Sequence, residues 1–243
     1  MNSVEAIILE SQPFGEADEV LTCITKERGK MRFRVRGVKK SQAKHRGTLQ
    51  RFNWTQIYFA GGQRGFPIAT DTILKESFPN IKSNLELLGA LEPIAKIVAR
   101  TLPVESADYP LWWQLTDYFL TLERKKTAAS RNLKLAPVFF AYRLLLLHGL
   151  KPELKNCLNC RAVLKDNSSF FSASAGGGLC LSCARHDRRA AQVSRPAREE
   201  LVAWSDLSFE LFLGRPRHPE AAAIREAIER FSEWHLGAVI ELV

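Results

Sequence analysis

The chain lacks the sequence motifs of the common hydrolase and nucleotide-cleaving enzyme classes. No His-Glu-x-x-His, Gly-x-Ser-x-Gly or Gly-x-x-x-x-Gly-Lys-Ser/Thr pattern occurs in its 243 residues. A catalytic zinc on a helix, a serine nucleophile on a tight turn and a P-loop are thereby excluded. The three glycines 176–178 stand just before a cysteine, where we expect a turn with permissive backbone rather than a phosphate cradle. We therefore predict a protein that is not an enzyme.

The sequence also lacks a long apolar run. Its longest, Val138 to Leu147, is interrupted by Arg143, whereas a membrane span needs roughly 18 apolar residues. Residues 1–5 provide no basic segment ahead of the short apolar run that follows, so we expect no signal peptide. These features favour a cytoplasmic protein.

Cysteine is scarce outside one stretch. Four of the five cysteines form Cys157-Leu-Asn-Cys160 and Cys180-Leu-Ser-Cys183, with nineteen residues between the pairs. Two Cys-x-x-Cys turns at about this separation are typical of a structural Zn²⁺ site, and four thiolates leave no open position for catalysis. Disulfide or redox use is the alternative, although disulfides need an oxidising compartment. Cys23, within an apolar alternation, is interpreted as a core residue.

The positive charge is unevenly distributed. Lys and Arg exceed Asp and Glu by 35 to 26, a formal charge of +9. Residues 1–80 hold 13 cations and 8 anions, residues 81–150 hold 9 and 6, and residues 151–243 hold 13 and 12. The surplus in the first third indicates an anionic partner there.

The first 80 residues predict a small β-barrel domain. Short β-branched or aromatic runs alternate with glycine-containing turns. Five such strands fit an OB-fold, although the pattern fits an SH3-like barrel nearly as well. The predicted strands are 4–9, 20–26, 30–38, 52–60 and 66–74.

The third predicted strand carries a basic face. Its side chains alternate, which puts Met31, Phe33 and Val35 on one face and four cations on the other. From Arg28 to Arg51 there are ten Lys or Arg and no acidic residue, a pattern that favours a phosphate backbone over a solvated edge strand. The predicted DNA-binding residues are Lys30, Arg32, Arg34, Arg36, Lys39, Lys40, Lys44, Arg46 and Arg51.

Aromatic residues follow this basic stretch. Phe52, Trp54 and Tyr58 share one face of the fourth predicted strand, and Ile57 and Phe59 share the other. One set is core, and the set that faces outward can stack on bases. The sequence leaves open which set that is.

Helical periodicity begins near residue 80. We expect helices over 85–102, with Pro93 kinking or interrupting the first, over 109–122 with Asp108 as its cap, and over 137–148 before Gly149. Later helices are expected near 198–213 and 220–242, after a basic segment at 185–198. The predicted fold is α+β, with an N-terminal OB-fold at 1–80 and an α-helical domain at 81–243 that carries a zinc module inserted at about 151–190.

The order of these parts resembles the bacterial recombination mediator RecO family. Arg51 stands where that family has proline, and the C-terminal end is short. The resemblance rests on Gly15-Glu-Ala-Asp18, Glu27-Arg-Gly-Lys30, Val35-Arg-Gly-Val-Lys-Lys40, Gly47-Thr-Leu-Gln-Arg-Phe52, the segment 144–157 and Gly177-Gly-Leu-Cys180.

This resemblance implies a DNA repair function in the RecF-type pathway. The family's properties would be binding of single- and double-stranded DNA, annealing of complementary strands and partnership with RecR. They would also include binding the acidic tail of single-stranded DNA-binding protein on the helical domain and helping to load RecA. Arg131 and Lys134 are the cations expected to meet that tail.

Two other functions fit the residues. One is a zinc-containing factor that binds RNA or the ribosome, which a comparison of DNA and structured-RNA affinity would distinguish. The other is a zinc-dependent nucleic-acid enzyme, for which no general base is evident beside the cysteines.

Overall fold

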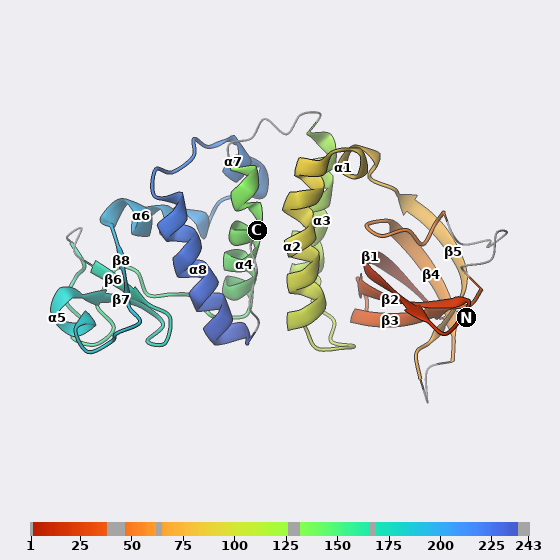
Figure 1. Cartoon of the computed structure of the whole chain (residues 1–243), viewed down its shortest axis with the longest axis horizontal. Helices are drawn as coiled ribbons and strands as arrows, with labels where there is room; N and C mark the ends of the chain where they lie inside the picture. Colours follow the sequence, from red (N-terminus) through yellow and green to blue (C-terminus); the bar gives the residue numbers. More distant parts are fainter. Residues whose placement is uncertain (1, 38–46, 62–64, 126–131, 166–168, 238–243) are drawn as a thin grey trace. The chain divides into compact units, whose positions relative to one another are not determined.

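The computed structural model describes residues 2–37, 47–61, 65–125, 132–165 and 169–237. The chain divides into two compact units, one of Met1–Leu85 with Ala95–Lys126 and one of Glu86–Ile94 with Thr127–Val243. The elements of both are labelled in Figure 1. Among the described helices, none combines the length and apolar character that crossing a membrane requires.

Five strands of the first unit form a closed barrel with the order β1-β2-β3-β5-β4. They are β1 (Asn2–Phe14), β2 (Asp18–Thr25), β3 (Gly29–Val35), β4 (Trp54–Ala60) and β5 (Ile68–Glu76). Neighbours pair antiparallel except β3 and β5, which close the barrel in parallel where Arg34 meets Ile68. The predicted OB-like barrel is therefore confirmed.

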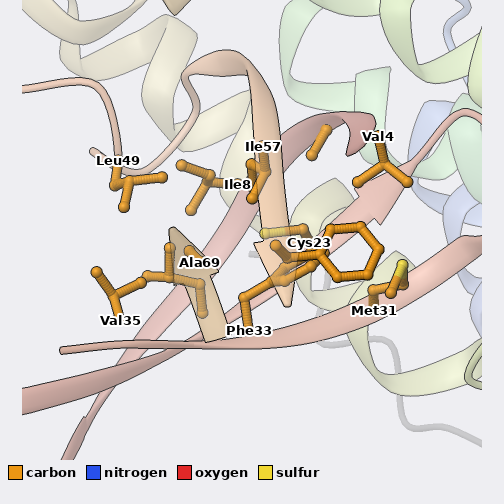
Figure 2. Close-up of a cluster of buried hydrophobic side chains, with 12 residues drawn as sticks. Val4, Ile8, Cys23, Met31, Phe33, Val35, Leu49, Ile57 and Ala69 are labelled. Atoms are coloured by element: carbon orange, nitrogen blue, oxygen red, sulfur yellow. The ribbon is translucent and has the colours of Figure 1, made fainter. Parts of the chain in front are cut away.

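Alternating side chains of these strands fill the barrel. Met31, Phe33 and Val35 of β3 lie in its core, as their alternation with cations indicated. Ile57 and Phe59 of β4 lie there too, which answers the question that the sequence left open for that strand. Figure 2 shows this cluster, in which the predicted core residue Cys23 lies beside Met31 and Phe33. Burial raises the pKa of the Cys23 thiol, so this thiol stays protonated and unreactive.

Helix α3 (Tyr109–Arg124) packs its apolar side against the outside of the barrel. It begins at the predicted cap, where Asp108 Oδ1 accepts from the Leu111 N–H at 2.9 Å. Trp112 meets Trp54 of β4 edge to face with ring centroids 5.7 Å apart, and Phe119 meets Phe52 in the same way at 5.7 Å. Two of the three aromatics that were candidates for base stacking are thus engaged by this helix.

Two further helices precede α3. Helix α1 (Pro79–Ser83) is short, and α2 (Leu85–Thr101) follows at the predicted position. Pro93 lies inside α2, which continues through it, so the predicted interruption does not occur. A proline costs one backbone hydrogen bond, and the neighbouring Leu91, Ile94 and Ala95 are buried, so packing offsets that loss.

The second unit contains a helical group around α4 (Ala136–Leu147), which begins after η1 (Leu133–Leu135) and ends before Gly149, as expected. The helix expected near 198–213 is instead two helices, α6 (Arg195–Trp204) and α7 (Phe209–Gly214). Ser208 explains the break, because its hydroxyl caps α7 by accepting from the Leu211 N–H. The last described helix is α8 (Ala221–Leu236).

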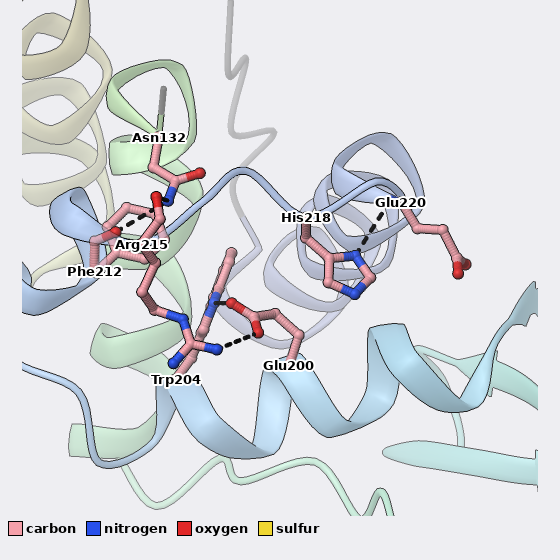
Figure 3. A network of polar contacts seen from close by, with 7 residues as sticks. All are labelled: Asn132, Glu200, Trp204, Phe212, Arg215, His218 and Glu220. Atoms are coloured by element: carbon pink, nitrogen blue, oxygen red, sulfur yellow. Dashed lines mark hydrogen bonds and ion pairs between the residues drawn. The ribbon is translucent and has the colours of Figure 1, made fainter. Parts of the chain in front are cut away.

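A polar network joins the start of this helical group to α6 and α7 (Figure 3). Asn132 Nδ2 donates to the carbonyls of Phe212 at 3.0 Å and Arg215 at 2.9 Å. Arg215 in turn pairs with Glu200, which also accepts from Trp204 Nε1 at 2.9 Å. These contacts position the segment that leads into η1.

A small sheet of order β7-β6-β8 completes the second unit. It consists of β6 (Ser169–Ser172), β7 (Gly177–Cys180) and β8 (Ala191–Val193), with the short α5 (Leu181–Ala184) after β7. The cysteine-containing module is thus inserted between α4 and α6. The compact unit that holds the barrel also includes α3, which packs on β4, and the predicted domain bounds 1–80 and 81–243 stay a prediction.

Candidate nucleic-acid interface and metal centre

The four cysteines of the two Cys-x-x-Cys turns converge. The Sγ atoms of Cys157, Cys160, Cys180 and Cys183 all lie within 4.8 Å of one another, and Cys160 Sγ is 3.7 Å from Cys180 Sγ. A disulfide would need about 2.0 Å, so these are free thiols. Four sulfurs held tetrahedrally at about 2.3 Å from one ion are about 3.8 Å apart. The cluster therefore fits a metal ion.

The glycines before the second turn are required by close backbone packing. Gly177 has φ +148°, and a Cβ there would lie 2.2 Å from the Glu153 carbonyl oxygen. A Cβ on Gly178 would lie 2.4 Å from Leu164 Cδ1. Gly177 and Gly178 thus begin β7 where a side chain has no room, and Gly178 N–H donates to Glu153 O at 2.7 Å and brings the two halves of the module together.

The pKa values of Cys157 and Cys183 are shifted in opposite directions. Burial raises the pKa of Cys157, but backbone N–H groups of Cys160, Cys180 and Asn159 outweigh it and lower the pKa to about 6. At Cys183 the Asn159 amide lowers the pKa, yet the neighbouring sulfurs together raise it to about 12. A divalent cation would stabilise all four thiolates at neutral pH.

Arg198 of α6 anchors the module. The side chain is buried, with 4% of its surface exposed, and its two terminal nitrogens donate to Leu154 O at 2.9 Å and Leu164 O at 2.8 Å. Desolvation lowers the pKa of this guanidinium. The sequence placed Arg198 at the end of the basic segment 185–198, and its contacts give it a structural role.

Arg32 and Arg36 are the predicted DNA-binding residues that the structure places in solvent. Arg32 lies on the outer face of β3 between buried Met31 and Phe33, and Arg36 follows the end of that strand. Over the described ranges, no carboxylate forms an ion pair with either guanidinium. Both cations are therefore available to an anionic ligand.

The alternation along β3 predicted an exposed Lys30, but the structure buries this side chain. It is 7% exposed, and its Nζ donates to the Ala99 carbonyl of α2 at 2.8 Å. Burial is the largest cause of a lowered pKa at this amine. The segment after α2 docks on this end of β3, where Glu105 N–H donates to Lys30 O at 2.8 Å. Alternation along a strand does not show whether another segment covers a side chain. Lys30 therefore does not belong to the exposed basic face of β3.

Arg34 and Arg51 make contacts within the barrel. Arg34 pairs with Asp18 at 2.6 Å, and Asp18 also accepts from the Gly37 N–H at 2.9 Å, which is the largest cause of its lowered pKa. Arg51 Nε donates at 2.6 Å to Leu9 O, beside the irregularity in β1. The remaining predicted DNA-binding residues, Lys39, Lys40, Lys44 and Arg46, lie outside the described residues, as does Arg131.

Two exposed aromatic residues, one of them against Arg34, were not predicted from the sequence as site residues. Phe14 at the end of β1 is 42% exposed, Phe66 before β5 is 39% exposed, and their rings meet edge to face at 6.4 Å. The Arg34 guanidinium lies over Phe14, 5.0 Å from the ring centroid. The available signal was the glycine and proline that flank each of them, in Pro13-Phe-Gly15 and Gly65-Phe-Pro67, although Phe66 was assigned to the start of the fifth predicted strand.

Lys134 is exposed within η1, between the buried Leu133 and Leu135. The Asn132 contacts described above hold the segment in place. The role of Lys134 in binding an acidic tail stays a prediction.

Two family models match the chain, "Recombination protein O N terminal" over residues 1–75 and "Recombination protein O C terminal" over residues 82–240. Curated relatives called "DNA repair protein RecO" align over most of it. The Desulforamulus reducens protein is 28% identical over 95% of this chain and 89% of its own length. The Dehalococcoides mccartyi protein is 31% identical, covering 73% and 68%, and the Roseiflexus protein is 33% identical, covering 79% and 66%.

Proposed function

Because the chain belongs to the RecO family of DNA repair proteins, we propose that it is a non-enzymatic recombination mediator that binds DNA on its barrel. Single- and double-stranded DNA would bind there, and complementary strands would anneal. The observations that carry this proposal are the exposed cations Arg32 and Arg36 and the exposed aromatic pair Phe14 and Phe66, of which Phe14 lies against Arg34 of strand β3. Cations hold phosphates and exposed rings stack on unpaired bases.

Annealing follows from this arrangement in physical terms. Two complementary strands repel each other through their phosphates, and cations on the protein reduce that repulsion while releasing condensed counterions. The predicted DNA-binding residues Lys39, Lys40, Lys44 and Arg46 follow Arg36 in the sequence and would supply further cations for phosphates. No nucleotide hydrolysis is needed, since base pairing supplies the free energy.

We also propose the partners that the family resemblance implies. These are RecR, RecA as the recombinase to be loaded, and the acidic tail of single-stranded DNA-binding protein. Exposed Lys134 supports a contact with that tail, and Arg131 stays a candidate from sequence alone. We expect the protein to act in the cytoplasm on the nucleoid.

The metal in the cysteine cluster is proposed to be one structural Zn²⁺. Four thiolates at the observed separations match its tetrahedral preference. Cys157, Cys160, Cys180 and Cys183 would each supply one sulfur and leave no position for a reacting water. The ion would hold the two Cys-x-x-Cys turns together and so stabilise the module against α6.

Strand annealing tests the mediator proposal. Two complementary oligonucleotides carrying a fluorophore and a quencher are coated with single-stranded DNA-binding protein, either intact or lacking its acidic tail. We expect faster quenching with the intact coat, without added nucleotide, because the tail recruits the mediator to the strands. Annealing no faster than in the absence of the protein would contradict the proposal. Stronger binding to structured RNA than to DNA would favour the RNA-binding alternative.

A further inference from the structure

A cleft of about 620 Å³ lies in the second unit, between the cysteine-containing module and α8. Its charged and aromatic lining consists of Arg188, Arg189, Arg230, Glu233 and Trp234. The first two follow α5, and the others lie on the last two turns of α8. None of these residues belongs to the candidate metal site or to the candidate DNA-binding residues of the barrel.

The wall that carries Arg188 and Arg189 is held in place by polar contacts. Asp187 accepts hydrogen bonds from the Ser172 hydroxyl and, at 2.9 Å, from the Arg189 N–H. Ser172 is the largest cause of the lowered pKa of Asp187, so this acceptor stays ionised. Arg230 Nη1 donates to Arg189 O at 3.2 Å, which ties the same segment to α8. These hydrogen bonds thus fix the positions of residues that line the cleft.

Its cations differ in availability. Arg230 is paired with Glu226 of the same helix at 2.6 Å. Arg188 and Arg189 are exposed, and within the part of the chain that the structure describes their side chains form no ion pair. Two neighbouring free guanidinium groups on a fixed segment suit phosphate oxygens, which they can bind in a bidentate manner.

The same cleft offers contacts for a base. Trp234 is 54% exposed, a large apolar surface for a protein to leave in water, and an exposed indole face stacks on any nucleobase. The neighbouring Glu233 carboxylate can accept a hydrogen bond from an exocyclic amino group. The cleft therefore combines cations that suit a phosphate with an indole ring and a hydrogen-bond acceptor that suit the base of the same nucleotide.

We propose that this cleft is a second binding site for single-stranded nucleic acid, separate from the barrel face. Arg188 and Arg189 bind the phosphates and Trp234 stacks on a base. A peptide made only of acidic residues would use the arginines but would place no ring on the exposed indole. This inference depends on the proposed function only in taking a nucleic-acid strand as the ligand. Two sites would let one chain hold two strands at once.

The test uses the full chain carrying Arg32→Ala and Arg36→Ala, so that the remaining binding reports on other sites. Affinity for a fluorescent single-stranded oligonucleotide is measured as a function of salt. Adding Arg188→Ala and Arg189→Ala should lower the salt slope by about 1.4, at about 0.7 per phosphate contact. Adding Trp234→Leu instead should lower affinity roughly tenfold. The control pair Arg217→Ala and Arg225→Ala removes two cations outside the cleft and should leave both quantities unchanged.

Three results would overturn the inference. The cleft variants could bind the strand as well as their background, they could lose affinity for an acidic peptide only, or a mononucleotide could compete as well as the oligonucleotide. Failure of the proposed function is a different result, namely wild-type protein that neither binds nor anneals DNA.

Discussion

Replacing Cys157 and Cys160 with serine should abolish metal binding and unfold the module. Structural Zn²⁺ contributes an apparent 10–16 kcal/mol in small zinc-binding peptides, which is as large as the whole stability of a typical domain, about 5–15 kcal/mol. The module has a small core of its own, formed around Cys157, Leu164, Leu179 and Ala184, and cannot compensate for that loss. Metal content and thermal unfolding measure the effect.

The matched control is Cys23→Ala. Cys23 is fully buried in the barrel core and is not one of the four clustered cysteines, so this variant should keep one metal ion per chain. Its melting temperature should fall modestly, through loss of a small buried group. A Cys157→Ser/Cys160→Ser protein that melts as the wild type does would contradict the structural role of the metal.

Replacing Phe14 and Phe66 with leucine should weaken binding of single-stranded DNA by about 30-fold. Each base stacked on an aromatic side chain contributes about 1–3 kcal/mol, and leucine keeps the apolar volume while removing the ring face. Double-stranded DNA should be much less affected, because its bases are already stacked on one another. Fluorescence anisotropy with a single-stranded oligonucleotide and its duplex, at one salt concentration, measures both affinities.

Trp113→Leu is the control for a general loss of exposed aromatic surface. Trp113 is 58% exposed on α3, where the Lys26 ammonium lies 5.5 Å from its ring centroid, and it is not one of the proposed DNA-binding residues. Its replacement should leave both affinities unchanged. Equal weakening of single strands and duplex by the Phe14 and Phe66 changes would argue against base stacking at this edge of the barrel.

The barrel was predictable because its signals are local. Alternation in β3 correctly separated Met31, Phe33 and Val35 from the cations, and turn residues marked the strand ends. The cysteine spacing was equally informative, since two Cys-x-x-Cys turns leave few arrangements other than one convergent cluster. The capping of α3 by Asp108 and the end of α4 before Gly149 followed from single residues.

What the sequence could not supply depends on contacts between distant segments. Lys30 is buried because the segment after α2 covers it, and Arg51 bonds to Leu9 O, forty-two residues away. Neither contact produces a periodic pattern in the sequence. The same holds for Arg198. In the sequence it is one of several arginines in a basic segment, and only the folded chain brings the carbonyls of Leu154 and Leu164 within hydrogen-bonding distance of it.

The salt dependence of DNA binding tests the central claim most directly, since the claim places phosphates against Arg32 and Arg36. Losing two contacts in Arg32→Ala/Arg36→Ala should reduce the slope of log affinity against log salt by about 1.4 on a single strand. Lys30→Met, which removes a buried cation from the same strand, should keep the wild-type slope. A wild-type slope in Arg32→Ala/Arg36→Ala would contradict DNA binding on this face of the barrel.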